Sequence, residues 1–212
     1  MEKYKGVKFR TVFLSKEAPK DERLVELAGW CRKFHELGLT PVVNGKSLGN
    51  LSFRLDEDSN KFIITASGLG PKDNLSAECF VKVIDCDLTK KIVYVHGLRK
   101  PSSESLLHYR IYKLRREVNA IFHGHDSSIT NYAGEIGLVQ TAKWHPYGSL
   151  ELVRSVEEVL NGNFFLVLKG HGFISLGRSM EEAGRLALEK KKIADKFYKN
   201  SKRESLCKSF TR

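Results

Sequence analysis

The sequence lacks the features of membrane-spanning proteins and of small secreted disulfide proteins. None of its apolar runs approaches the roughly 18 residues that a transmembrane helix requires. The first ten residues, MEKYKGVKFR, contain no apolar stretch of the kind found in a secretion signal. The four cysteines lie far apart and form no C-x-x-C pair, which argues against a disulfide framework and a cysteine metal site. We therefore expect a cytoplasmic protein with reduced thiols and no membrane partner.

The sequence also lacks a central stretch of one charge sign, although the net charge is +11. Residues 1–20 carry six basic and two acidic side chains, and residues 183–212 carry ten basic and three acidic ones. The interval between them is neutral. A nucleic-acid interface would need a basic stripe interleaved with stacking aromatic residues. We therefore expect solvated basic ends and no nucleic-acid partner.

Length and composition indicate a single globular domain with a hydrophobic core large enough to stabilise its fold. The chain has 212 residues, of which 41% are hydrophobic. We assign residues 1–20 to an irregular basic arm, 21–200 to the domain and 201–212 to a basic tail. Short strands interleaved with helices predict an α/β or α+β protein, and hairpin patterns favour a largely antiparallel sheet. Helices are expected at 21–38, 102–116, 127–133, 150–160 and 180–198, and strands at 51–55, 61–65, 80–85, 91–95, 118–122 and 164–168.

Three histidines follow predicted apolar strands. His123 and His125 stand two positions apart, so a continuing strand would direct both imidazoles to the same face. His171 follows the strand FFLVL and lies between two glycines. An H-x-H pair alone is often incidental, and a single histidine in a loop can be merely structural. Three neutral imidazoles with an open coordination position nevertheless suit a catalytic zinc or similar divalent ion.

Three further motifs combine small polar residues with glycine or a helix start. KPSSE at 100–104 begins a predicted helix, where free N–H groups and hydroxyls suit a phosphate. The same residues also make an ordinary helix N-terminus. GNLS at 49–52 and TASG at 65–68 flank a predicted hairpin and can bind an oxyanion, although each alone is also a common turn.

In this order the five motifs GNLS, TASG, KPSSE, HGH and GHG resemble the class II aldolase/adducin family, most closely its L-fuculose-phosphate aldolase branch. The resemblance extends from about Leu24 to Phe197. It implies an α/β fold of three layers, with a central and mainly antiparallel sheet flanked by helices. It also implies a homotetramer with active sites at the subunit interfaces.

The resemblance assigns a role to each motif. His123, His125 and His171 would hold Zn²⁺ or another divalent ion such as Mn²⁺, Co²⁺ or Fe²⁺. Glu104 would be the catalytic acid and base, because it occupies the position of the glutamate in P-S-S-E. The residues implied to bind the substrate phosphate are Asn50, Ser67, Gly68, Ser102 and Ser103.

The resemblance implies a metal-dependent lyase that cleaves a short ketose 1-phosphate into dihydroxyacetone phosphate and a small aldehyde. Related members with P-S-S-D resemble sugar-phosphate 4-epimerases, and those with P-S-A-E resemble dehydratases. Ser103 and Glu104 together favour the aldolase, although decarboxylases and other lyases share P-S-S-E. An adducin-like interaction module is the alternative without catalysis, but such members lack the metal histidines.

One element of the aldolase branch has no clear counterpart in this chain. That branch uses a tyrosine between the H-x-H and G-H-G motifs as a proton donor at a neighbouring subunit's site. Tyr132, His145 and Tyr147 lie in this interval, and Tyr198 lies beyond it. Each of them also has an interpretation as a packing or turn residue.

Overall fold

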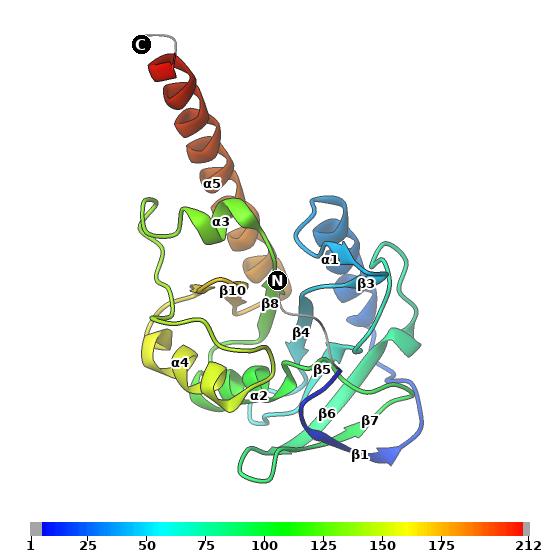
Figure 1. The fold of residues 1–212 in the computed structure, drawn as a ribbon. Coiled ribbons are helices and arrows are strands. Elements are labelled where there is room, and N and C mark those ends of the chain that lie inside the picture. The colour runs from blue at the N-terminus through cyan, green and yellow to red at the C-terminus, as the bar shows by residue number, and fades with distance from the viewer. Residues whose placement is uncertain (1–5, 210–212) are drawn as a thin grey trace.

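The structure, a computed structural model, describes the backbone of residues 6–209 and the side chains of residues 6–203. Its centre is a sheet in the order β1-β7-β6-β5-β4-β8-β10-β9 (Figure 1). The strands are β1 (Arg10–Ser15), β4 (Asn50–Arg54), β5 (Phe62–Thr65), β6 (Phe80–Asp87), β7 (Ile92–His96), β8 (Ala120–Gly124), β9 (Phe165–Leu168) and β10 (Gly172–Gly177). A separate small hairpin consists of β2 (Val42–Val43) and β3 (Lys46–Ser47). The helices are α1 (Leu24–Glu36), α2 (Ser105–Leu114), α3 (Ser127–Asn131), α4 (Leu150–Leu160), α5 (Met180–Ser209) and the 3₁₀ turn η1 (Ala77–Cys79).

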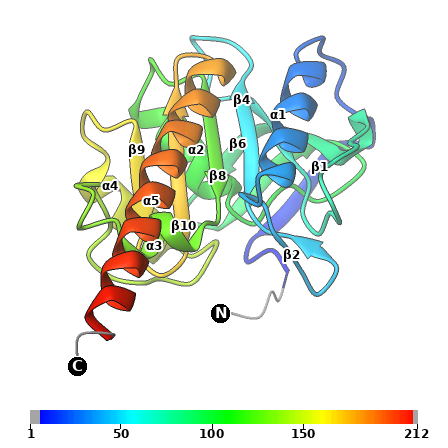
Figure 2. The same ribbon diagram turned by 90° about the horizontal axis from the view of Figure 1, so that it is seen from above.

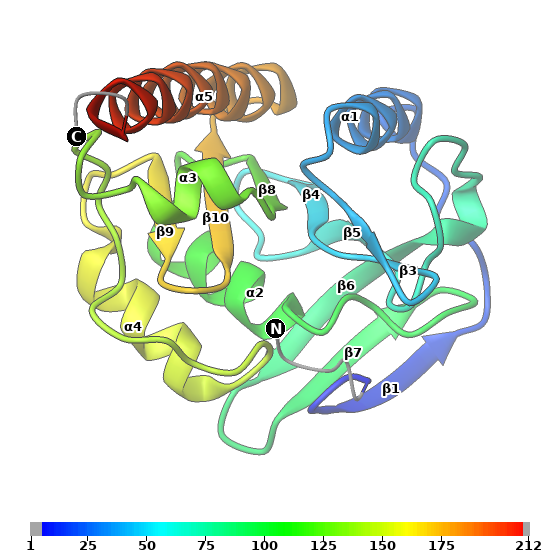
Figure 3. The same cartoon turned by 45° about the horizontal axis from the view of Figure 1, so that its top comes forward.

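Helices cover both faces of the sheet, which confirms the predicted three-layer α/β architecture. Figures 2 and 3 show α1, α3 and α5 on one face and α2 and α4 on the other. The first face packs Phe34 of α1 and Ala183 of α5 against Phe122 of the sheet. The second face packs Leu107 of α2 and Val156 of α4 into the other core. Strands buried on both faces are continuously apolar, and this explains segments such as FLVL in β9.

The sheet is mainly antiparallel, as predicted. The β4–β5 hairpin pairs Ser52 with Ile64, and every other neighbouring pair within the sheet is antiparallel except β1 with β7. Strand β10 was not predicted, and it lies between β8 and β9. It therefore brings the two histidine-bearing segments to the same part of the sheet.

The N-terminal arm was expected to be irregular, and this is wrong for Arg10–Ser15. These residues form the edge strand β1, parallel to β7. Such a parallel pairing joins residues about 80 positions apart, so no local sequence pattern predicts it. The last helix also continues past the predicted end at residue 198 and runs to Ser209 (Figure 1). Part of the expected tail, 201–209, is thus helical, and residues 210–212 lie outside the described part.

None of the described helices combines the length and the apolar composition needed to cross a membrane.

Candidate metal centre and active site

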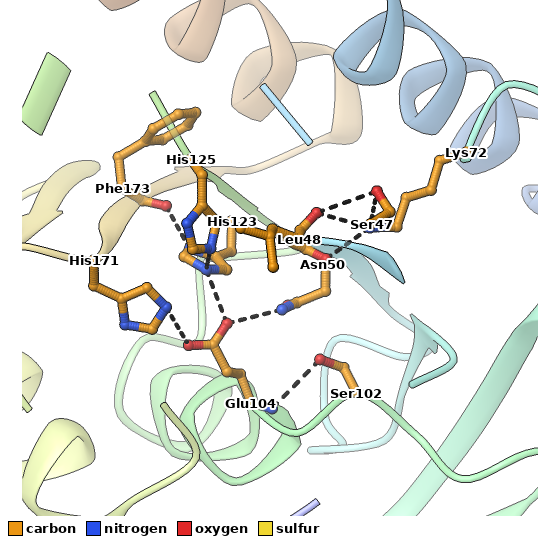
Figure 4. Close-up of polar contacts among 11 residues, drawn as sticks. Ser47, Leu48, Asn50, Lys72, Ser102, Glu104, His123, His125, His171 and Phe173 are labelled. Carbon is orange, nitrogen blue, oxygen red and sulfur yellow. Dashed lines mark hydrogen bonds and ion pairs between the residues drawn. The ribbon is translucent and has the colours of Figure 1, made fainter. Parts of the chain in front are cut away.

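The three predicted metal ligands meet at one end of β8 and β10. His123 is the penultimate residue of β8, His125 follows that strand, and His171 immediately precedes β10. Because β8 and β10 pair antiparallel, with His123 opposite Ile174, the two segments end side by side. Each histidine offers a ring nitrogen, and these nitrogens all lie within 4.8 Å of one another (Figure 4). The expected convergence of His123 and His125 is therefore found, with 3.1 Å between their Nε2 atoms.

A hydrogen bond from His123 to the backbone orients that imidazole. Its Nδ1 lies 2.8 Å from the Phe173 carbonyl oxygen, which can only accept, so Nδ1 carries the proton. In the neutral ring Nε2 then presents its lone pair to the other histidines. Burial is the largest influence on the pKa values of His123 and His125 and lowers both. The site thus favours neutral imidazoles, which are the form that binds a metal ion.

Glu104 lies directly against this cluster, just before the first residue of α2. Its side chain is 3% exposed, and Oε2 lies 3.0 Å from His123 Nε2 while Oε1 lies 3.5 Å from His171 Nε2 (Figure 4). Oε2 also accepts a hydrogen bond of 2.8 Å from the Asn50 amide. Burial is the largest influence on the pKa of Glu104 and raises it, but the hydrogen bond from Asn50 and the charge that His123 and His171 carry when protonated together lower the pKa below its usual value. The direction of this shift favours the ionised carboxylate.

The donor set fits a divalent metal ion. Three imidazole nitrogens converge beside a carboxylate, which is the ligand chemistry that zinc and related ions prefer. In the described part of the chain, the buried atoms Glu104 Oε1 and Asn50 Oδ1 have no hydrogen-bond partner. Buried polar atoms are normally paired, so these two unpaired oxygen atoms indicate a place where a polar ligand can bind.

Two of the predicted phosphate-binding segments lie side by side next to Glu104. The Ser67 N–H donates to the Lys100 carbonyl at 2.9 Å, and the Ser102 N–H donates to the Thr65 carbonyl at 3.1 Å. The segment after β5 is thereby joined to the segment before α2. Gly68 is exposed at the surface of this junction. The third segment, GNLS, reaches the same place through Asn50, whose amide donates a hydrogen bond to Glu104.

The segment Trp144–Gly148 runs from the metal centre to this junction. A Cβ added at Gly148 would lie 2.7 Å from the Ser103 carbonyl oxygen, and one added at Gly170 would lie 3.2 Å from Trp144 Cδ1. The segment therefore touches the chain beside His171 at one end and a predicted phosphate residue at the other. The motifs did not reveal this segment, which is here called the wall segment.

The candidates for the family's tyrosine separate into two groups. Tyr132 packs on Phe197 and Tyr198, with ring centroids 5.2 and 6.1 Å away, between α3 and α5. These contacts support the packing interpretation for both tyrosines. Tyr147, in contrast, belongs to the wall segment, where the Lys8 ammonium lies 4.0 Å from its ring centroid. His145 belongs to the same segment.

A buried polar cluster lies one helical turn beyond Glu104. Ser52 Oγ lies 2.8 Å from His108 Nδ1 and 2.8 Å from the Tyr112 hydroxyl. Burial lowers the pKa of His108 to about 3, so this ring is neutral at physiological pH. His108 follows Glu104 by four residues, and its partner Ser52 belongs to the GNLS motif.

A family model described as "Class II Aldolase and Adducin N-terminal domain" matches residues 25–197. The chain belongs to this family. An L-fuculose phosphate aldolase of Methanococcus maripaludis is 28% identical over 149 residues, which are 64% of this chain and 76% of the relative. A 3-oxo-tetronate 4-phosphate decarboxylase of Haemophilus influenzae is 28% identical over 197 residues, or 84% of this chain and 86% of the relative. The solved structure of an L-fuculose 1-phosphate aldolase superposes with a TM-score of 0.69 at 24% identity, covering 88% of this chain and 89% of the other.

These matches confirm the class II aldolase fold and place the chain among enzymes of several reaction types. Class II aldolases depend on a metal, and the three histidines of this chain form a site able to bind one. The identity of the metal and the roles of Glu104 and the phosphate residues remain predictions.

The close approach of β8 and β10 makes Gly172 a sensitive position. A Cβ there would lie 2.4 Å from the Gly124 carbonyl oxygen and 3.0 Å from His123 Cε1. We expect Gly172→Ala to displace His123, to lower metal occupancy severalfold and to destabilise the fold by about 1–3 kcal/mol. Elemental analysis and thermal unfolding measure both effects. Gly134→Ala is the matched control, because a Cβ there meets no atom within 4 Å; equal metal content in the two variants would contradict the prediction.

Proposed function

We propose that the protein is a metal-dependent aldolase that cleaves a short ketose 1-phosphate into dihydroxyacetone phosphate and a small aldehyde. The observation that carries the proposal is the buried Glu104 carboxylate, which lies 3.0 and 3.5 Å from ring nitrogens of two of the three predicted metal ligands. A carboxylate so placed can move a proton on a substrate that also reaches the metal. The L-fuculose phosphate aldolase relative supports this choice.

The roles of the residues follow from their positions. In the direction of condensation, Glu104 takes a proton from the carbon next to the carbonyl of dihydroxyacetone phosphate. That carbon then bonds to the aldehyde carbon, and the proton that Glu104 took up is returned to the aldehyde oxygen, which becomes a hydroxyl. Asn50 holds the carboxylate in place through its amide. A divalent ion held by the histidines supplies Lewis-acid stabilisation of the negative charge that develops.

The phosphate of the substrate is assigned to the junction of the three loop segments. Asn50, Ser67, Gly68, Ser102 and Ser103 supply amide, hydroxyl and backbone N–H groups there, which are the donors an anion requires. These residues orient the substrate and take no part in bond breaking.

We propose zinc as the metal, since three imidazoles and an open position are its usual catalytic arrangement, with Mn²⁺, Co²⁺ and Fe²⁺ as the alternatives. A cytoplasmic homotetramer is the assembly that the family resemblance implies. Light scattering tests the assembly, and a stable active monomer would contradict it.

A decarboxylase acting on a sugar-acid phosphate is the second candidate. The decarboxylase of Haemophilus influenzae aligns over 84% of this chain, against 64% for the aldolase of Methanococcus maripaludis. Loss of carbon dioxide from a 3-oxo acid also leaves negative charge next to a carbonyl group, so the same metal and carboxylate would serve. Epimerase, dehydratase and adducin-like activities are further alternatives.

The test is consumption of dihydroxyacetone phosphate by zinc-replete protein with lactaldehyde, glycolaldehyde or glyceraldehyde, beside a sample treated with chelator. We expect condensation that the chelator abolishes, with a preference among the aldehydes. No condensation by protein with bound zinc would overturn the aldolase proposal, and 3-oxo-tetronate 4-phosphate would then be the next substrate to test.

A further inference from the structure

Lys72 is a buried lysine that neither the family motifs nor the proposed reaction uses. It lies in the loop between β5 and η1, yet it is only 1% exposed. Its ammonium donates hydrogen bonds to Ser47 Oγ at 3.1 Å, to the Leu48 carbonyl at 2.9 Å and to the Gly49 carbonyl at 2.8 Å (Figure 4). Lysine is almost never fully buried without a partner of opposite charge. A charge buried among neutral acceptors is costly, which points to a specific role.

The three acceptors belong to the segment that leads directly into Asn50. Gly49 has a φ of 71°, and a Cβ there would lie 2.5 Å from the His123 carbonyl oxygen, so the segment lies tightly against β8. The next residue, Asn50, pairs with His123 in the sheet and donates its amide to Glu104. In Figure 4, Lys72 reaches this segment from one side and the Asn50 amide leaves it on the other. Lys72 thus bonds to the backbone that leads directly into Asn50.

We propose that Lys72 is a positioning residue for substrate binding: its ammonium fixes the Ser47–Gly49 backbone and thereby holds Asn50 where it can meet the substrate phosphate. The inference rests on the proposed function, because it takes the Asn50 segment as part of a phosphate site.

The charge of Lys72 persists under ordinary conditions. Burial is the main influence on its pKa and lowers it to about 8, so the ammonium form predominates at pH 7. Lys72 therefore brings a buried positive charge to the Ser47–Gly49 backbone.

The first experiment measures the binding of inorganic phosphate and of dihydroxyacetone phosphate to the metal-loaded protein by calorimetry. We expect Lys72→Met to raise both Kd values about 10-fold or more, because it removes three hydrogen bonds from a charged donor. Metal content should stay at the wild-type level. Lys61→Met, which changes an exposed lysine just before β5, is the control and should bind as the wild type does.

A double-mutant cycle separates positioning from a merely structural role. If Lys72 acts through Asn50, adding Lys72→Met to Asn50→Ala should weaken phosphate binding by less than about twofold, since the coupled effects do not add. Full additivity would overturn the proposal, and so would loss of metal from Lys72→Met. If Lys72→Met does not fold, Ser47→Ala removes a single acceptor. It should then raise the Kd about 2- to 5-fold, and an unchanged Kd would contradict the inference.

This test measures equilibrium binding, so its outcome does not depend on whether the protein catalyses the proposed reaction. Wild-type protein that binds phosphate without condensing dihydroxyacetone phosphate would overturn the aldolase and leave the role of Lys72 standing. Equal phosphate affinity in the wild type and Lys72→Met would overturn that role and leave the aldolase standing. A wild-type protein that binds neither phosphate probe would overturn the inference.

Discussion

Replacing Glu104 with glutamine is expected to lower turnover by about 100- to 10,000-fold, which is the usual contribution of a positioned acid or base. Glutamine has the same shape, and its carbonyl oxygen can still accept the hydrogen bond from Asn50. Glutamine cannot, however, accept a proton from the reacting carbon of the substrate. The fold and the metal content should therefore persist while the reaction stops. Steady-state kinetics, elemental analysis and thermal unfolding on the same preparation measure the three quantities.

Glu157→Gln is the matched control for this variant. Glu157 pairs with Arg110 between α4 and α2, so the substitution removes a helix-borne carboxylate and its ion pair outside the metal centre. It should retain wild-type turnover. If Glu104→Gln also kept wild-type turnover, Glu104 would not be the base, and the wall segment Trp144–Gly148 would be the place to search for it.

Replacing His171 with alanine is expected to remove the metal and, with it, the activity. Removing a residue that only hydrogen-bonds to a metal ligand typically lowers metal affinity about 10- to 100-fold. Removing a ligand itself should lower the affinity by more than this. His171 suits this test better than His123, because its ring lies in a loop and is 10% exposed, whereas the His123 ring is 1% exposed and bonded to the Phe173 carbonyl. Its loss should leave the sheet intact.

Elemental analysis after dialysis, together with titration of zinc against a competing chelator, measures the effect. His96→Ala, on β7, tests whether the loss of any histidine has the same consequence. Its metal content should match that of the wild type. Undiminished zinc in His171→Ala would remove this residue from the ligand set and leave only the H-x-H pair.

The elements that were predicted are those whose pattern is local. The hairpin formed by β4 and β5 follows from two apolar runs and a polar turn, and the convergence of His123 and His125 follows from their spacing. Strand β10 was missed because all six of its residues are buried, so it shows no alternation of polar and apolar positions. Strand β1 was missed because its partner lies far away in the chain.

The site divides in the same way between local and non-local information. The motif residues could be named in advance, but the contact of Glu104 with His123 depends on the packing of α2 against the end of β8. A lysine in a loop is ordinarily exposed, and no property of the segment around Lys72 predicts its burial. The Phe173 carbonyl that orients His123 is a backbone group, so no residue type in the sequence predicts this hydrogen bond.

The central claim is that three histidines hold a divalent ion beside Glu104, and anomalous diffraction from zinc-replete crystals at the zinc edge tests it most directly. The structure predicts a strong peak about 2.0–2.1 Å from one ring nitrogen each of His123, His125 and His171, within reach of the Glu104 carboxylate. A zinc peak bound by other residues, or zinc-replete crystals without a peak at these histidines, would contradict the account.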